Sequence, residues 1–152
     1  RGRRGGPAAR WLRSTQMELN VDIVSAEGEI YSGAADMVFA SAEMGEVGIA
    51  PRHAPLLTRL KPGEVRVKST SGEQSFFVSG GILEVQPYQV TVMADTAARA
   101  GDLDEAAALE AKKRAEEALA NQSADVDLAM AQAELAEAAA RLHLLQKLKS
   151  KR

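Results

Sequence analysis

The chain has 152 residues, a formal net charge of −2 and no cysteine. This length can bury one core of ordinary size with a small appendage. The missing cysteines exclude disulfides and thiolate metal sites, which is consistent with a reducing compartment. No apolar run approaches the roughly 20 residues of a transmembrane helix, so we expect any membrane association to occur through partners only.

The first sixteen residues, RGRRGGPAARWLRSTQ, carry five arginines and no acidic residue. The rest of the chain therefore has a net charge of −7, which argues against nucleic acid as a partner. The Gly-Gly-Pro sequence in this segment would break the amphipathic helix of a transit peptide. We expect residues 1–16 to be a disordered extension of non-native or upstream origin, with a targeting segment as the alternative, and the fold to begin near Met17.

Between residues 17 and 99 the sequence predicts short β-strands. The segment ELNVDIVS alternates, with Leu19, Val21 and Ile23 on one face and polar residues on the other. EVRVKS alternates in the same way, and SGEQSFFVSGGILEVQPYQVTVMAD contains three apolar runs separated by glycine and proline turn signals. We therefore expect an antiparallel β-sandwich or flattened barrel.

Residues 100–152 predict two α-helices. Asp102 followed by Glu105 is a variant of the capping box, so we expect the first helix to start there and to run to about Ala120. The segment NQSAD ends this helix and offers N-cap candidates for a second one, which continues to about Lys149. So short a turn predicts an antiparallel hairpin, and the expected fold class is α+β.

Alanine dominates the predicted hairpin, with fifteen residues between Ala106 and Ala140. Alanine has the best helix propensity, so each helix should be nearly self-supporting. An alanine seam nevertheless buries little area, and the packing of the helices should be weak. Two interpretations follow: a hairpin docked permanently on a stand-alone binding module, or a hairpin that changes partners.

His53 stands between two prolines in the segment GEVGIAPRHAPLLTRLKPG and raises the question of catalysis. A nucleophile would need a base and an orienting group, but no Gly-x-Ser-x-Gly elbow is present, and the other histidine, His143, lies in the second helix. The acidic residues Asp102, Asp104 and Glu105 fit a helix N-terminus better than an acid/base pair or a magnesium site. We expect no catalytic residue, no metal site and no cofactor; a hydrolase using His53 is a minor alternative.

Four segments, taken in order, resemble the epsilon subunit of bacterial F-type ATP synthases: VDIVSAEGEIYSG, GEVGIAPRHAPLLTRLKPG, VSGGILEVQPYQVTVMADTA and DLDEAAALEAKKRAEEAL. The resemblance extends from about Met17 to the C-terminus, and its specificity comes from the combination of the four. It implies a non-catalytic subunit in the central stalk of the proton-translocating ATP synthase. The implied location is the cytoplasmic face of the bacterial inner membrane, with attachment through the complex.

The resemblance also implies partners for each half. Residues 17–99 would bind the gamma subunit and rest on the c-ring, with ring-side loop contacts at Glu46, Arg52 and His53. Residues 100–152 would form a regulatory hairpin that either folds on the sandwich or extends along gamma to the alpha/beta catalytic head, where it restrains ATP hydrolysis. The expected contacts to the head lie in the basic end of the second helix: Arg141, Lys147, Lys149, Lys151 and Arg152.

Some members of the family bind ATP on the hairpin through an Ile/Leu-Asp-x-x-Arg-Ala motif and further arginines of the second helix. The corresponding positions here are Leu103, Asp104, Ala107 and Ala108, so an alanine replaces the arginine. Guanidinium groups are the strongest phosphate donors among side chains. We therefore expect this chain to bind ATP weakly or not at all.

Overall fold

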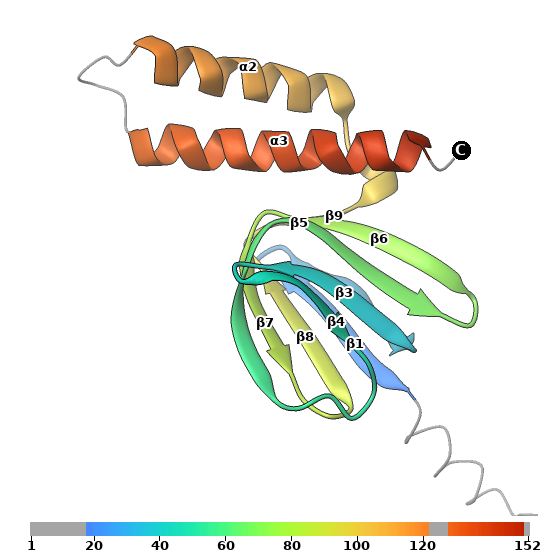
Figure 1. Cartoon of the computed structure of the whole chain (residues 1–152). Helices are drawn as coiled ribbons and strands as arrows, with labels where there is room; N and C mark the ends of the chain where they lie inside the picture. Colours follow the sequence, from blue (N-terminus) through green and yellow to red (C-terminus); the bar gives the residue numbers. More distant parts are fainter. Residues whose placement is uncertain (1–17, 122–127, 151–152) are drawn as a thin grey trace, which may run out of the picture.

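The computed structural model describes residues 18–121 and 128–150, in which nine strands precede a 3-10 helix and two α-helices (Figure 1). The expectations for residues 1–16, for the NQSAD turn beyond Asn121, and for Lys151 and Arg152 lie outside the described residues. The elements are β1 (Leu19–Ser25), β2 (Gly28–Ala35), β3 (Met37–Ala42), β4 (Gly45–Ile49), β5 (Leu56–Ser69), β6 (Gly72–Val78), β7 (Gly81–Val85), β8 (Gln89–Ala94), β9 (Ala97–Arg99), η1 (Ala100–Asp102), α2 (Glu105–Asn121) and α3 (Leu128–Ser150).

The strands form a sandwich whose sheet is not closed into a barrel. Neighbouring strands follow the order β2-β1-β8-β7-β5-β3-β4, and β6 pairs with both β5 and β9. The described pairs are antiparallel except β1 and β8, which run parallel. A parallel pair needs a long connection, and β1 and β8 are separated by most of the domain. The predicted sandwich followed by a two-helix hairpin is thus confirmed, with one parallel pair.

Strand β5 links the two layers of the sandwich. Its first part, up to Leu60, pairs with β7, and its second part, from Gly63, pairs with β6. Pro62 lies between these two ladders, where its missing N–H removes no ladder hydrogen bond. The segment GEVGIAPRHAPLLTRLKPG is therefore mostly strand, and only residues 50–55 form a loop, because pairing with neighbouring strands supplies the order that the local sequence lacks.

The sandwich has apolar residues on both faces of strand β6. Phe76 and Phe77 are neighbours in sequence and both are fully buried. Phe76 belongs to the main core, together with the predicted inward residues of β1, whereas Phe77 packs in a second cluster with Ala100 and Leu144. Consecutive residues of a strand point to opposite faces. The hairpin therefore covers a face of the sheet that would otherwise expose an aromatic ring.

The first α-helix begins later than the capping-box pattern predicted. Asp102 ends the 3-10 helix η1, and α2 starts at Glu105. The N-cap is Asp104, whose Oδ1 accepts a hydrogen bond of 3.2 Å from the backbone N–H of Ala107. An N-cap side chain accepts a hydrogen bond from the backbone N–H of the second or third helical residue. Ala107 is the third residue of α2, and Asp104 directly precedes the helix, so Asp104 and not Asp102 is the N-cap. None of the described helices is long and apolar enough to cross a membrane.

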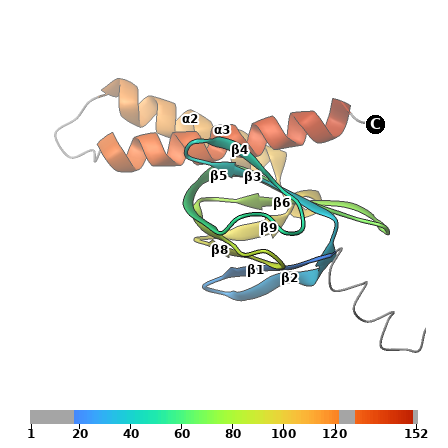
Figure 2. The ribbon, with the colours of Figure 1, turned by 60° about the horizontal axis from the view of Figure 1, so that its bottom comes forward.

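The two α-helices pack side by side through alanine, and α3 is the helix that contacts the sheet, at β5 (Figures 1 and 2). The larger apolar residues Leu109 and Met130 are more than half exposed. The buried hairpin residues are mainly small: Ala108, Ala115, Ala131, Ala138, Leu142 and Leu144. The alanine seam that the sequence predicted is therefore present, and the apolar area it buries is small.

Candidate functional site

The clearest polar cluster of the sandwich surrounds Arg66 on β5. Its guanidinium lies 3.2 Å from Glu46 Oε1, 3.2 Å from Glu64 Oε1 and 3.4 Å from Glu73 Oε1. The same group stacks on the ring of Phe39 at 4.5 Å from the centroid. Both the ion pairs and the cation–π contact restrict the guanidinium, so Arg66 is held in place by the sheet.

The Arg52–His53 turn lies in the loop between β4 and β5. Arg52 has a φ of +68°, and its backbone N–H donates to Pro87 O at 2.7 Å. The backbone N–H of His53 donates to Ala50 O at 3.2 Å, and its Nδ1 lies 2.7 Å from Ala54 O. A positive φ is rare for residues other than glycine. The backbone hydrogen bonds of Arg52 and His53 hold the turn in this uncommon conformation.

The three candidates for ring contacts therefore have different environments. Arg52 and His53 share one turn, whereas Glu46 lies on β4 and pairs with Arg66. Glu46 also lines a groove of about 450 Å³ between the sheet and α3, to which Glu64, His143 and Lys147 contribute. Within the described residues, no three His, Cys, Asp or Glu side chains are grouped so that they could hold a metal ion.

The described candidates for head contacts on α3 are all engaged within the chain. Arg141 lies over the ring of Phe77, 5.0 Å from its centroid, and pairs with Glu137 at 2.7 Å. Lys147 pairs with Glu64 of β5 at 2.9 Å, and Lys149 pairs with Glu105 at the start of α2. Sequence reasoning missed Phe77 and Glu64 as their partners. The consecutive buried phenylalanines were a usable signal, because they require covers on both faces of the strand.

The positions of the degenerate ATP motif serve the structure of the hairpin. Leu103 packs against the Phe77 cluster, Asp104 caps α2 and Ala108 is buried in the seam, whereas Ala107 is exposed. None of these side chains carries a positive charge that could bind phosphate.

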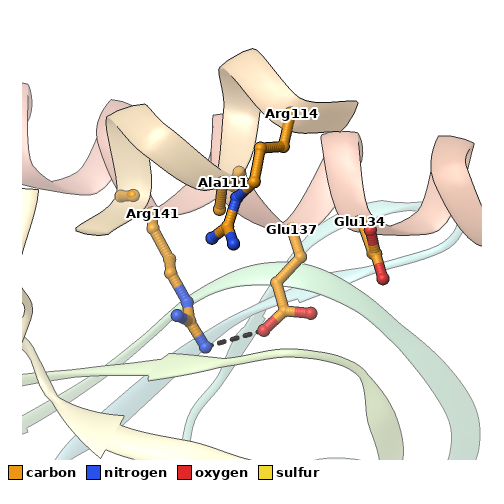
Figure 3. A pocket seen from close by; sticks show the side chains of 7 residues that line it. Ala111, Arg114, Glu134, Glu137 and Arg141 are labelled. Atoms are coloured by element: carbon orange, nitrogen blue, oxygen red, sulfur yellow. Dashed lines mark hydrogen bonds and ion pairs between the residues drawn. The ribbon is translucent and has the colours of Figure 1, made fainter. Parts of the chain in front are cut away.

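A nearby groove of about 330 Å³ between α2 and α3 does contain arginine (Figure 3). Arg114 and Arg141 line it, but so do Glu134 and Glu137, and Arg141 points to Glu137. Two carboxylates balance the two guanidinium groups, so the groove offers no net positive charge to an anion.

The described residues form a β-sandwich that carries a docked two-helix hairpin, with ionic clusters on the surface of the sheet. Comparison with known proteins assigns both parts of this architecture to one family. Residues 18–100 match the beta-sandwich domain of the ATP synthase delta/epsilon chain, and residues 102–146 match its long alpha-helix domain.

Several curated relatives cover nearly the same length. The chain is 64% identical to the ATP synthase epsilon chain of Nitrosococcus oceani, over 89% of this chain and 97% of that one. It is 66% identical to that of Alkalilimnicola ehrlichii, over 86% of this chain and 94% of that one. The chain belongs to the family of epsilon subunits of bacterial F-type ATP synthases and is a non-catalytic subunit.

Two solved structures share the fold at low sequence identity. A chain in the Euglena gracilis mitochondrial ATP synthase aligns with a TM-score of 0.66 and 18% identity, over 89% of this chain and 81% of that one. A chain in the Tetrahymena thermophila mitochondrial ATP synthase aligns with a TM-score of 0.51 and 16% identity, over 88% of this chain and 98% of that one. At these identities the matches concern the fold.

Proposed function

We propose that the chain is a rotor subunit of the central stalk, which couples rotation of the c-ring to the catalytic head through gamma. The observation that carries this proposal is high identity to epsilon chains along nearly the whole of their length. The two solved structures with this fold are of an OSCP/F1/c-ring assembly and of a central stalk/c-ring assembly, which is the setting proposed here. The subunit would then lie at the cytoplasmic face of the membrane, attached through the complex.

The sandwich would provide the contacts to gamma and the ring. The Arg52–His53 turn is the better candidate for ring contact, because it is a surface loop held by hydrogen bonds in which Arg52 is exposed and His53 is partly exposed. Glu46 is already paired with Arg66, so a contact there would have to share or replace that ion pair. Glu46 is thus a weaker candidate than the turn.

The hairpin would restrain ATP hydrolysis when it leaves the sandwich and extends to the alpha/beta head. Its alanine seam buries little apolar area. The free-energy difference between the docked and the extended hairpin should therefore be only a few kcal/mol, which the binding of a partner can reverse. Arg141, Lys147 and Lys149 would bind acidic groups of the head once they are free of their present partners, with Lys151 and Arg152 beyond them. The missing arginine at Ala107 and the balanced charges of the groove favour weak ATP binding.

Removal of residues 103–152 tests the regulatory half of this proposal. The truncation keeps β9, which pairs with β6, so the sandwich should still bind gamma and bring down the c-ring in a pull-down. Hydrolysis by the assembled synthase should rise about two- to tenfold, because the inhibitory element is gone. A full-length Lys112→Gln variant, which changes one exposed charge of α2, is the control. Unchanged hydrolysis would contradict an inhibitory hairpin, and failure to bind gamma would contradict the stalk assignment.

A further inference from the structure

Within the described residues, one ion pair joins the hairpin to the sandwich. Lys147 Nζ of α3 lies 2.9 Å from Glu64 Oε1 of β5. The Glu64 side chain is only 13% exposed and that of Lys147 is 38% exposed. An ion pair that is this shielded from water is screened less by salt than a pair on the open surface.

The sheet holds Glu64 ready for this contact. Arg66 Nε approaches the same Oε1 at 3.2 Å, so two cations share one carboxylate oxygen. The other oxygen, Glu64 Oε2, is buried without a hydrogen-bond partner in the described residues. Burial of an ionised carboxylate raises the free energy of the folded chain unless nearby cations balance its charge. Arg66 and Lys147 balance the charge of Glu64, and undocking of the hairpin would remove Lys147.

The charge balance of the cluster points in the same direction. Arg66 is one cation facing three carboxylates, those of Glu46, Glu64 and Glu73. Two other lysines of the sheet lie near the cluster: Lys68 is 5.4 Å from the centroid of the Phe39 ring, and Lys61 lines the same groove as Glu64. Among the described residues neither forms an ion pair with Glu64, so Lys147 supplies the second cation in contact with this carboxylate, at the place where α3 crosses β5.

We propose that Glu64 and Lys147 form a built-in latch that holds the hairpin docked without nucleotide. The inference rests on the proposed function, because it assumes a hairpin that can leave the sandwich. The groove between α2 and α3 offers an anion no net positive charge, and Ala107 stands where a phosphate-binding arginine would be. Docking is therefore carried by the chain itself, through the latch and the apolar contact of Leu144 with Phe77.

The latch also means that Lys147 cannot pair with Glu64 and contact the catalytic head at the same time. Lys147 is a candidate for contact with acidic groups of the catalytic head, and while the hairpin is docked its ammonium is occupied by Glu64. Release exchanges one carboxylate partner for another. The strength of the Glu64–Lys147 pair then sets how strong a competing acidic partner has to be.

Spin labels on the free, full-length subunit can measure the docked fraction. The chain has no cysteine, so Asp36→Cys and Gln146→Cys, both at exposed positions on the sandwich and on α3, give a unique label pair. The label-to-label distance distribution reports the ratio of docked to undocked molecules. We expect Lys147→Gln and Glu64→Gln each to lower this ratio about tenfold, which corresponds to about 1.4 kcal/mol. The charge swap, Glu64→Lys with Lys147→Glu, should restore part of it.

Three comparisons decide the proposal. The double variant Glu64→Gln/Lys147→Gln should have about the same ratio of docked to undocked molecules as either single variant, because each single substitution already removes the whole ion pair. Lys112→Gln, which affects an ion pair inside α2, should leave the ratio unchanged, and so should added ATP. An unchanged ratio in Lys147→Gln, additive effects of the two substitutions, or a docked fraction that rises with ATP would overturn the latch. Because the free subunit is measured, this failure is distinct from a failure of the truncation test.

Discussion

At Gly81 the backbone has a φ of +130°, and a Cβ there would lie 2.1 Å from the carbonyl oxygen of Met93. The residue pairs with Leu60 on one side and Ala94 on the other, so the neighbouring backbone cannot move aside cheaply. The Gly-Gly sequence predicted a turn or bulge at this point. What it could not predict is the close approach of a second strand, which depends on the pairing of β7 with β8.

Gly81→Ala should lower the free energy of unfolding by about 2–4 kcal/mol, because it combines a forbidden dihedral angle with a backbone clash. Urea denaturation of the free subunit measures this. Gly101→Ala is the matched control, since a Cβ at Gly101 would meet nothing within 4 Å, and its effect should stay within about 0.5 kcal/mol. Equal stability of the two variants would show that the sheet relaxes around position 81.

The site residues were predictable to different degrees, for reasons that depend on distance along the chain. Alternation in EVRVKS placed Val65 and Val67 inward and Arg66 outward, and both valines are buried. Glu64 is two residues from Arg66 on β5, so alternation alone places the two side chains on one face. Glu46 and Glu73 lie on β4 and β6, and their contact with Arg66 depends on strand pairing, which no local pattern identifies. The family resemblance groups Glu46 with the Arg52–His53 turn because they share one segment, and the structure adds that Glu46 pairs with Arg66.

At the scale of elements, the helices follow from local sequence, whereas their docking does not. Alanine and the other good helix formers indicate both helices directly, and this prediction is confirmed. Docking depends on Phe77, Leu144 and the Glu64–Lys147 pair, which join residues far apart in the chain. A hairpin with strong helices and a small interface can separate from its partner without unfolding.

Ala115→Leu should test how tightly the seam is packed. Ala115 is 1% exposed, so a leucine would force the helices apart and cost about 1–3 kcal/mol, while helix propensity would be nearly unchanged. We expect faster amide hydrogen exchange throughout the hairpin, with little change in the sandwich or in helix content by circular dichroism. Ala106→Leu, at an exposed position of α2, is the control. Unchanged exchange in the Ala115 variant would mean that the seam has room for larger side chains.

At the scale of the whole molecule, the hairpin docks on one part of the sandwich and the Arg52–His53 turn is anchored to another. The turn is anchored by the bond from Arg52 N–H to Pro87 O, in the β7–β8 connection, whereas α3 contacts β5. A subunit in a rotating stalk needs a face for the ring that does not change when the hairpin moves. Separate anchoring meets this requirement, since release of α3 breaks none of the hydrogen bonds described for the turn.

His53→Ala should therefore weaken the proposed contact with the ring while leaving the subunit intact. A peripheral contact of this kind is worth about 0.5–1 kcal/mol, so the affinity for a gamma–c-ring complex should fall about two- to fivefold. The free energy of unfolding should change by less than about 1 kcal/mol, since His53 is only partly buried and its ring bonds only the neighbouring carbonyl of Ala54. Arg52→Gly removes the neighbouring charge while keeping a residue that adopts a φ of +68° without strain, so it should act in the same way. Glu27→Ala, an exposed change in the β1–β2 turn, is the control. If both turn variants bind the complex as tightly as the control does, the ring must contact another part of the sandwich.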